Sequence, residues 1–453
     1  MRPILAQLNE YSYRESKSII IYVMRKFYNV LFNTLVANVT TNFLWFALTF
    51  WVYLETKSVV MTSIIGGSYM LLVAVTSMYF GTLVDKHHKK NIMIASSLIT
   101  LTGYALGGIA YLSFDKAELL SAGHPAFWLL IIPLLIGAVV ESMRNIALST
   151  TVTLLVPMND RDKANGMIGM VTGMAFLVTS VFSGLAIGQL GMGWTMVIAI
   201  ALTAVALGHL FFVEIPEEKI FHDPELAKKK VDFAGSIAAI RIVPGLMMLI
   251  FFSTFNNFIG GVFMSLMDAY GLTLFSVEMW GFMLAVSSLG FIAGGIAIGK
   301  FGLGKNPLRT LLLICIVMAL LGAVFAIREW QWLFVLGMFL YMSIIPAAEA
   351  AEQTIVQRVV PLKSQGRVFG FSQTVEAAAT PITAFAIGPL AQYVFIPYMN
   401  GEGKQQLGWL LGSGQARGIA LVFVVASLVM LVGALLAFRT KAYRLLTNHY
   451  AES

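Results

Sequence analysis

The sequence predicts an all-α membrane protein whose twelve transmembrane helices form two pseudosymmetric six-helix bundles. Composition is the first reason: 58% of the 453 residues are hydrophobic and only 12% are charged, whereas soluble domains are about a quarter charged. The second reason is a series of apolar runs of about 20 residues, the length that crosses a hydrocarbon core. The third is a set of features that recurs 204 residues along the chain.

The apolar runs lack the alternating pattern of barrel strands, so each is expected to be a helix. A soluble protein with this many buried helices is a poor alternative at such hydrophobicity. The runs are centred near Leu44, Leu71, Leu101, Ile136, Leu177, Leu202, Phe252, Leu289, Val317, Met342, Thr383 and Val425.

The basic residues predict that both termini are cytoplasmic. If the helices alternate from a cytoplasmic N-terminus, 24 of the 30 Lys and Arg residues fall in cytoplasmic segments. Five lie in outer loops, and Arg144 lies inside a span. This asymmetry is the positive-inside bias. The net charge of +7 therefore reflects topology, and its dispersal over many loops argues against nucleic-acid binding.

Five segments follow from this topology. They are a cytoplasmic N-terminal segment (1–27), an N-terminal bundle (28–213), a cytoplasmic linker (214–243), a C-terminal bundle (244–439) and a cytoplasmic tail (440–453). The first segment lacks the compact apolar core of a cleavable signal peptide; an amphipathic surface helix and a disordered tail both fit it. The linker charges are interpreted as a solvated surface. The lone Cys315 cannot form an internal disulfide.

The repeat indicates that the two bundles arose by internal duplication, a common plan among transporters. The junction after the fourth run and the junction after the tenth run share a Val-Pro pair and a later glycine. Three pairs keep the same offset: Val156-Pro157 with Val360-Pro361, Gly166 with Gly370, and Gly184 with Gly388.

A charged motif, Gly81-Thr-Leu-Val-Asp85-Lys86-His-His-Lys89-Lys90, fills the short gap between the second and third runs. An acid at a membrane edge is costly unless it is paired, and basic residues follow this one directly. The motif resembles the G-x-L-A-D-R-x-G-R-K loop of the major facilitator superfamily. Here Val84 replaces Ala, Lys86 and Lys89 replace Arg, and His88 replaces Gly.

With its two halves and its linker, the chain resembles this superfamily from about Tyr28 to Phe438. The second Val-Pro junction, which continues with Gly-Arg-Val-Phe-Gly, resembles more narrowly the bacterial macrolide-efflux and enterobactin-exporter branch, of the drug:proton antiporter type. The resemblance implies a cavity lined by helices one, four, seven and ten. It also implies that Asp85 meets basic groups and the start of helix eleven to lock an inner gate. The expected gate residues are Gly81, Asp85, Lys86, Lys89, Lys90 and Arg367.

Six charged residues lie within the spans, where charge is costly and usually faces a cavity or a partner; one of them, Asp268, lies close to the outer end of the seventh span. Glu141 and Arg144 share one helix face, and so do Glu349 and Glu352. We interpret these four residues and Glu376 as a proton-coupling group in the central cavity, because desolvation favours the neutral form of a carboxyl group. Glu376 or Glu352 is the first choice for the titrating acid. A structural ion pair between Arg144 and either Glu141 or Glu349 is the alternative.

Polar stripes on the first and seventh spans are candidates for the substrate cavity. Interhelical hydrogen bonding is an equally good explanation for each single Asn. The candidates are Asn38, Thr41, Asn42, Trp45, Asn256, Asn257 and Asp268.

These features predict a secondary active transporter that exports amphipathic or cationic small molecules in exchange for protons. A siderophore-type metabolite exporter and a lysophospholipid carrier or flippase are alternatives. The fifth span lacks the Gly-Pro pair common in proton antiporters, and Arg144 lacks the usual following Gln-Gly. Export and proton coupling therefore depend on the branch resemblance.

An enzyme is not expected, because the chain has no phosphate-binding loop, nucleophile elbow or metal-ligand spacing. No cofactor is expected beyond a proton gradient. The expected partners are a small-molecule substrate, protons and the lipid bilayer, without nucleic acid, for a monomer in the bacterial inner membrane.

Overall fold

The computed structural model describes residues 2–56, 59–217, 232–412 and 414–452. Every regular element within these residues is a helix. Twelve of the helices are long and apolar enough to cross a membrane. The prediction of an all-α protein with twelve spanning helices is confirmed.

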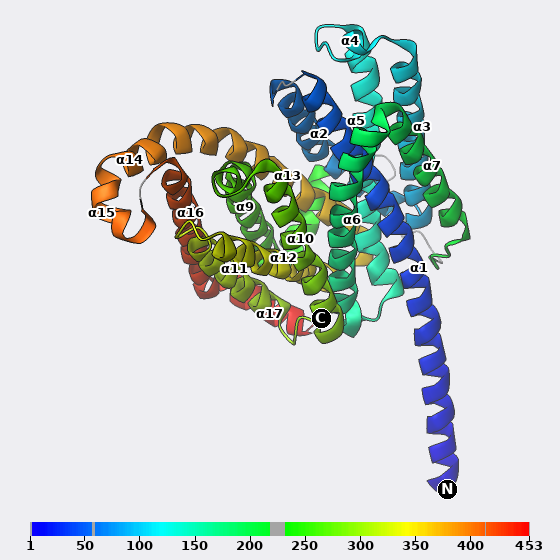
Figure 1. Cartoon of the computed structure of the whole chain (residues 1–453). Helices are drawn as coiled ribbons and strands as arrows, with labels where there is room; N and C mark the ends of the chain where they lie inside the picture. Colours follow the sequence, from blue (N-terminus) through cyan, green and yellow to red (C-terminus); the bar gives the residue numbers. More distant parts are fainter. Residues whose placement is uncertain (1, 57–58, 218–231, 413, 453) are drawn as a thin grey trace.

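The spanning helices divide into two sets of six, and Figure 1 shows each set gathered into its own bundle. The N-terminal bundle contains α1 (Arg2–Thr56), α2 (Val59–Lys86), α3 (Lys89–Ser113), α5 (Pro125–Leu155), α6 (Arg161–Gln189) and α7 (Gly191–Phe212). The C-terminal bundle contains α9 (Leu246–Leu274), α10 (Val277–Phe301), α11 (Pro307–Val324), α12 (Gln331–Val359), α13 (Leu362–Leu390) and α16 (Gln415–Arg439).

Shorter helices join or follow the spans. The N-terminal segment is helical from Arg2 and continues without a break into the first span as α1, which projects from the bundle in Figure 1. The linker segment 214–243 ends in a helix, and the tail 440–453 forms another. The shorter elements are α4 (Lys116–Leu119), η1 (Met158–Asp160), α8 (Phe233–Ile242), the π-helix η3 (Ala391–Phe395), α14 (Ile396–Asn400), α15 (Glu402–Leu411) and α17 (Lys441–Glu452).

The tail helix α17 packs against the C-terminal bundle. Its Leu446 is buried, and a Cβ added to Gly245 would lie 2.4 Å from the Ala442 carbonyl oxygen. The Arg358 guanidinium of α12 stacks over the Tyr450 ring at 4.4 Å. The tail is therefore part of the folded unit.

The 204-residue repeat has a structural counterpart in the turns after α5 and α12. In each turn, a polar side chain in the first turn of the next helix donates to the carbonyl oxygens five and eight residues before it. The end of the preceding helix leaves these oxygens without a backbone partner. The contacts are Arg161 Nε to Val156 O (3.3 Å), Arg161 Nη2 to Thr153 O (3.1 Å), Gln365 Nε2 to Val360 O (2.9 Å) and Gln365 Nε2 to Gln357 O (3.1 Å).

Glycines bring the two bundles together at one end. A Cβ added to Gly81 would lie 2.3 Å from the Gly366 carbonyl oxygen, so α2 and α13 touch backbone to backbone. The equivalent crossing of α6 and α10 places Gly166 against Gly299, where an added Cβ would lie 3.0 Å from the backbone nitrogen. These crossings and the α2–α3 turn lie at one end of the molecule, which we call the closed end.

The third pair of repeated glycines does not lie at a tight helix crossing. Gly184 and Gly388 lie farther along α6 and α13, and a Cβ added to either would meet nothing within 4 Å. We call this opposite end, where α4 and α15 lie, the open end. The repeated glycines therefore mark tight packing at one end of the molecule and free space at the other.

Candidate functional site

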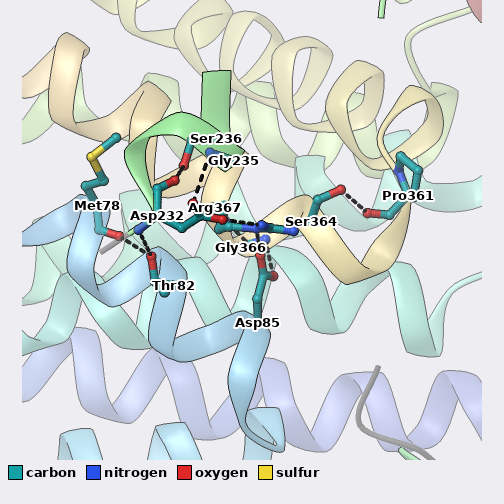
Figure 2. A network of polar contacts seen from close by, with 10 residues as sticks. All are labelled: Met78, Thr82, Asp85, Asp232, Gly235, Ser236, Pro361, Ser364, Gly366 and Arg367. Atoms are coloured by element: carbon teal, nitrogen blue, oxygen red, sulfur yellow. Dashed lines mark hydrogen bonds and ion pairs between the residues drawn. The ribbon is translucent and has the colours of Figure 1, made fainter. Parts of the chain in front are cut away.

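Asp85 crosses from one bundle to the other at the closed end. Its carboxylate accepts hydrogen bonds from the backbone N–H groups of Gly366 (2.7 Å) and Arg367 (2.9 Å), and from Arg367 Nε (3.2 Å). The Asp85 side chain is fully buried. The structure thus forms the contact between Asp85 and the start of the eleventh span that the motif implies, because the glycine crossing brings the end of α2 against the first turns of α13 (Figure 2).

A second carboxylate holds the other side of Arg367. Arg367 Nη1 donates to Asp232 Oδ2 at 2.6 Å, and Asp232 is 4% exposed. The Asp232 side chain also caps α8, since it accepts from the backbone N–H of Gly235 at 3.0 Å. Figure 2 shows Arg367 between the two acids. The linker thus contributes a buried charge to this end of the molecule.

Two basic residues of the motif, Lys89 and Lys90, bind the linker and the end of α7. Lys89 Nζ lies 2.8 Å from Glu217 Oε1, and the backbone N–H of Lys89 donates to the other carboxylate oxygen of Glu217 at 2.8 Å. Lys90 donates to the Phe211 carbonyl oxygen at 2.9 Å, and Lys86 is the last residue of α2. The Glu217 side chain is only 7% exposed. The interpretation of the linker charges as a solvated surface is therefore wrong for Glu217 and for Asp232.

A second polar contact joins the bundles at the closed end. The backbone N–H of Leu303 donates to Asp162 Oδ2 at 2.7 Å. Asn165 Nδ2 donates to Thr354 Oγ1 and Gln357 Oε1, both at 2.9 Å. These bonds link α6 to α12 and to the turn after α10, and they lie beside the glycine crossing of α6 and α10.

Arg144 is buried inside the N-terminal bundle. It is 1% exposed, and its guanidinium donates to Ser97 Oγ at 3.0 Å and to the Asn33 side-chain oxygen. Arg144 Nε lies 3.8 Å from Glu141 Oε1. The expected alternative pair between Arg144 and Glu349 is not formed, because the partners of Arg144 belong to α1, α3 and its own helix.

Glu141 faces a small polar cavity in the same bundle. The cavity offers about 10 Å³ to the centre of a water molecule, which is about the room that one ordered water needs. Glu141 Oε1 has no hydrogen-bond partner among the described residues. The cavity is lined by Ala37, Thr40, Thr41, Ser97, Thr100, Glu141, Thr203 and Ala206.

Two of the three remaining acids, Glu352 and Glu376, meet at one hydroxyl group in the C-terminal bundle. Ser372 Oγ lies 2.6 Å from Glu376 Oε1 and 3.1 Å from Glu352 Oε1. Asn257 Nδ2 lies 3.5 Å from the other carboxylate oxygen of Glu376. Glu349 is exposed, one helical turn before Glu352 on α12. The five charged residues expected in a single group therefore form two groups, one in each bundle.

The candidate cavity residues of the first and seventh spans also lie in different bundles, and those of the first span come first. Thr41 lines the small cavity, Trp45 packs on Tyr69 with ring centroids 4.8 Å apart, and Asn42 is half-buried beside them. Asn38 Oδ1 is buried without a hydrogen-bond partner among the described residues.

In the seventh span, Asn257 joins the acidic group and Asn256 is half-buried. Asp268 is exposed and accepts from Trp280 Nε1 at 2.9 Å. A role of these residues in substrate binding stays a prediction.

Among the residues that contact the predicted site residues, several were not foreseen from the sequence, including Asn33, Ser97, Ser372 and Asp232. Asn33 and Ser97 are small polar residues in apolar spans, and Ser372 is one helical turn before Glu376. Spacing could have indicated Ser372, because residues four apart share a helix face. The partners of Asn33, Ser97 and Asp232 are far away in the sequence, and no local pattern marks them.

Comparison with known proteins agrees with this architecture. Macrolide efflux protein A of Streptococcus pyogenes is 23% identical over 367 residues, which cover 79% of this chain and 87% of the relative. The crystal structure of the transporter FucP in the outward conformation matches with a TM-score of 0.68 at 13% identity, covering 93% of this chain and all of FucP. A bacterial homologue of the iron transporter ferroportin, in its outward-facing state, matches with a TM-score of 0.64 at 13% identity, covering 92% of this chain and all of that protein. The sequence model of the Major Facilitator Superfamily matches residues 30–384, most of the chain, and the protein therefore belongs to this superfamily of membrane transporters.

Proposed function

We propose that the protein exports amphipathic or cationic small molecules in exchange for protons, by alternating access. It acts as a monomer in the bacterial inner membrane, with both termini in the cytoplasm. The observation that carries the proposal is the acidic group of the C-terminal bundle, where Glu352 and Glu376 share the hydroxyl of Ser372.

A proton and a cationic substrate can compete for the pair of carboxylates formed by Glu352 and Glu376. Two carboxylates that share one hydroxyl repel each other when both are ionised, so a proton or a cationic substrate between them relieves the repulsion. Arg144 is held in the other bundle by Asn33 and Ser97. The C-terminal acids are therefore available for exchange, with Glu376 or Glu352 as the proton carrier and Glu349 nearest to the entering substrate.

The closed end supplies the gate. With the Lys and Arg residues of that end facing the cytoplasm, the tight contact of Asp85 with Arg367 closes the inner side and leaves the outer side accessible. In this role Gly81 permits the contact, Lys89 anchors the loop on the linker and Lys90 anchors it on the end of α7. Alternating access then requires Asp85 to leave α13 when the inner side opens.

The proposed export direction and substrate class are based on the names of the relatives. Those that match over most of their length carry the name macrolide efflux protein A. The 24 Met and 32 Phe residues suit an apolar pocket that can repack around different substrates.

Transport by purified protein in vesicles tests the proposal. An imposed pH gradient is expected to drive uptake of cationic dyes or a macrolide into inside-out proteoliposomes, and a protonophore is expected to abolish it. Glu352→Gln and Glu376→Gln are expected to lose gradient-driven uptake while still binding substrate. Glu402→Gln on α15 removes a carboxylate at the open end and serves as the matched control.

Gradient-driven uptake at the unmodified rate in both variants of the acidic group would contradict proton coupling at this site. Lipid transfer without any gradient, and without dye transport, would favour a lysophospholipid carrier. Transport of a single siderophore-like metabolite alone would favour a dedicated exporter.

A further inference from the structure

The linker places two buried acids at the two ends of a row of charges. Asp232 pairs with Arg367, and Arg367 pairs with Asp85. Next to Asp85, Lys89 pairs with Glu217. The signs alternate along this row, and both of its outer anions, Asp232 and Glu217, belong to the linker rather than to a spanning helix.

The pairs of this row differ in which bundles they connect. Asp232 immediately precedes α8, which packs against α13 and α9 of the C-terminal bundle. Arg367 lies on α13, so the Asp232–Arg367 pair stays within one half. Asp85 lies on α2 of the other half. The backbone N–H of Asp232 also donates to Thr82 Oγ1 on α2, at 3.4 Å. Separation of the two bundles at the closed end therefore breaks this long backbone contact and the Asp85–Arg367 pair, but not the bond between the Asp232 carboxylate and Arg367.

We propose that Asp232 is the counter-ion that keeps Arg367 paired when Asp85 leaves it, so that the linker determines how readily the closed end opens. Removing the partner of a buried charge is strongly destabilising, and the Arg367 side chain is only 8% exposed. With Asp232 in place, Arg367 retains an anion in both states. Without that charge, Asp85 is the only acid left on Arg367 among the residues that the structure describes, and its departure becomes more costly. The inference rests on the gate proposed above.

Substitutions of Asp232 can distinguish the effect of its charge from the effect of its capping bond to α8. Asn and Ser are N-cap residues of about the same quality as Asp, so Asp232→Asn retains the cap on the Gly235 N–H and removes only the charge. Glu214→Gln removes a charge from the same linker at an exposed pair with Lys26 and is the matched control. Asp232→Glu retains the charge and tests for rescue.

A single cysteine reports opening of the closed end. Ser149 is 7% exposed, and its carbonyl oxygen accepts a bond from Gln357 of the opposite bundle at 2.8 Å. Ser149→Cys in a Cys315→Ala background is labelled with a water-soluble maleimide, and the labelling rate measures opening. Asp232→Asn is expected to slow labelling by about tenfold, within the range of ordinary coupling between sites. Asp85→Asn is expected to accelerate it, and Glu214→Gln and Asp232→Glu are expected to leave it close to the parent rate.

The outcomes separate the inference from the gate on which it rests. If Asp85→Asn accelerates labelling but Asp232→Asn labels at the parent rate or faster, the counter-ion role is refuted and the gate survives. If Asp85→Asn leaves the labelling rate unchanged, the gate itself is refuted, and the counter-ion role with it. If Asp232→Asn expresses poorly, Asp232→Ser provides the same test.

Discussion

The Asp85 carboxylate accepts hydrogen bonds from both the backbone and the side chain of Arg367, a residue 282 positions further along the chain, at 2.9 and 3.2 Å. This contact holds the end of α2 against the start of α13 in a fully buried site. It is made beside the glycine crossing of the two bundles, so in the proposed gate its strength sets the balance between the closed and open forms of this end.

Replacing Asp85 by Asn is expected to slow transport about tenfold with little change in the substrate concentration for half-maximal rate. Hydrogen bonds to a charged group contribute about 1.5–3 kcal/mol, and this contribution stabilises the closed end rather than the bound substrate. Initial rates in proteoliposomes measure the effect. Glu55→Gln, which removes an acid paired with Lys116 near the open end, is the control. A normal maximal rate in Asp85→Asn would leave Asp85 without the proposed role.

Replacing Gly81 by Ala is expected to abolish transport while the protein still inserts and folds. The added methyl group would lie 2.3 Å from the Gly366 carbonyl oxygen, so the two helix backbones must move apart and the closed end cannot form. Gly184→Ala is the matched control, since its methyl group meets nothing within 4 Å and Ala favours a helix by roughly 0.5–1 kcal/mol over Gly. Transport assays and thermal melts of both variants measure activity and folding separately. Equal transport by Gly81→Ala and Gly184→Ala would contradict a functional role for the close crossing of α2 and α13.

Replacing Arg144 by Met is expected to destabilise the protein by about 3–5 kcal/mol, because it leaves the buried Glu141 without its compensating charge. The double variant with Glu141→Gln is expected to regain part of this loss, since neighbouring charges couple. Melting temperatures in detergent of the two single variants and the double variant measure the coupling. Strictly additive effects would show that the pair at 3.8 Å contributes no coupling.

Docking of the tail helix is expected to weaken above pH ~10, the ordinary pKa of tyrosine. Burial raises the pKa of Tyr450 when α17 is docked, and the stacked Arg358 acts in the opposite direction with a smaller effect. The undocked phenol loses its proton first as the pH rises, so free energy of docking is lost there and retained below it.

Limited proteolysis of the tail between pH 8 and 11 measures this docking. Tyr450→Phe is expected to remove the pH dependence, because phenylalanine keeps the ring and does not titrate. A pH dependence that persists in Tyr450→Phe would assign it to another group.

The spanning helices could be predicted because their signal is local. An apolar run of about 20 residues has no alternative to a helix in a bilayer. The runs centred near Leu44 and Val425 therefore predict spans without any information about the helices that pack against them. The short helices α4, α14 and α15 were not predicted, since polar loops of this length carry no comparable constraint.

The candidate site was foreseen in part. The contact of Asp85 with Arg367 followed from a motif, whereas Asp232 was not foreseen, because its partner lies 135 residues away and its own surroundings in the sequence are polar. Glu141 and Arg144 make their contacts within the N-terminal bundle, which the sequence could not show, because spacing along a helix gives the shared face of two residues but not the direction in which that face points. A shared role of these two residues with the C-terminal acids in proton coupling stays a prediction.

By itself the sequence determined that this protein is a twelve-span membrane transporter with a duplicated plan, since hydrophobic length, charge asymmetry and a 204-residue repeat are properties of the chain alone. The tertiary structure decided which charges meet. It enclosed Arg144 within one bundle, gathered three acids in the other, and placed the linker acid Asp232 on Arg367. Such pairings depend on how whole helices rotate and cross, and those are set by close packing at glycines such as Gly81 and Gly366 rather than by any local pattern.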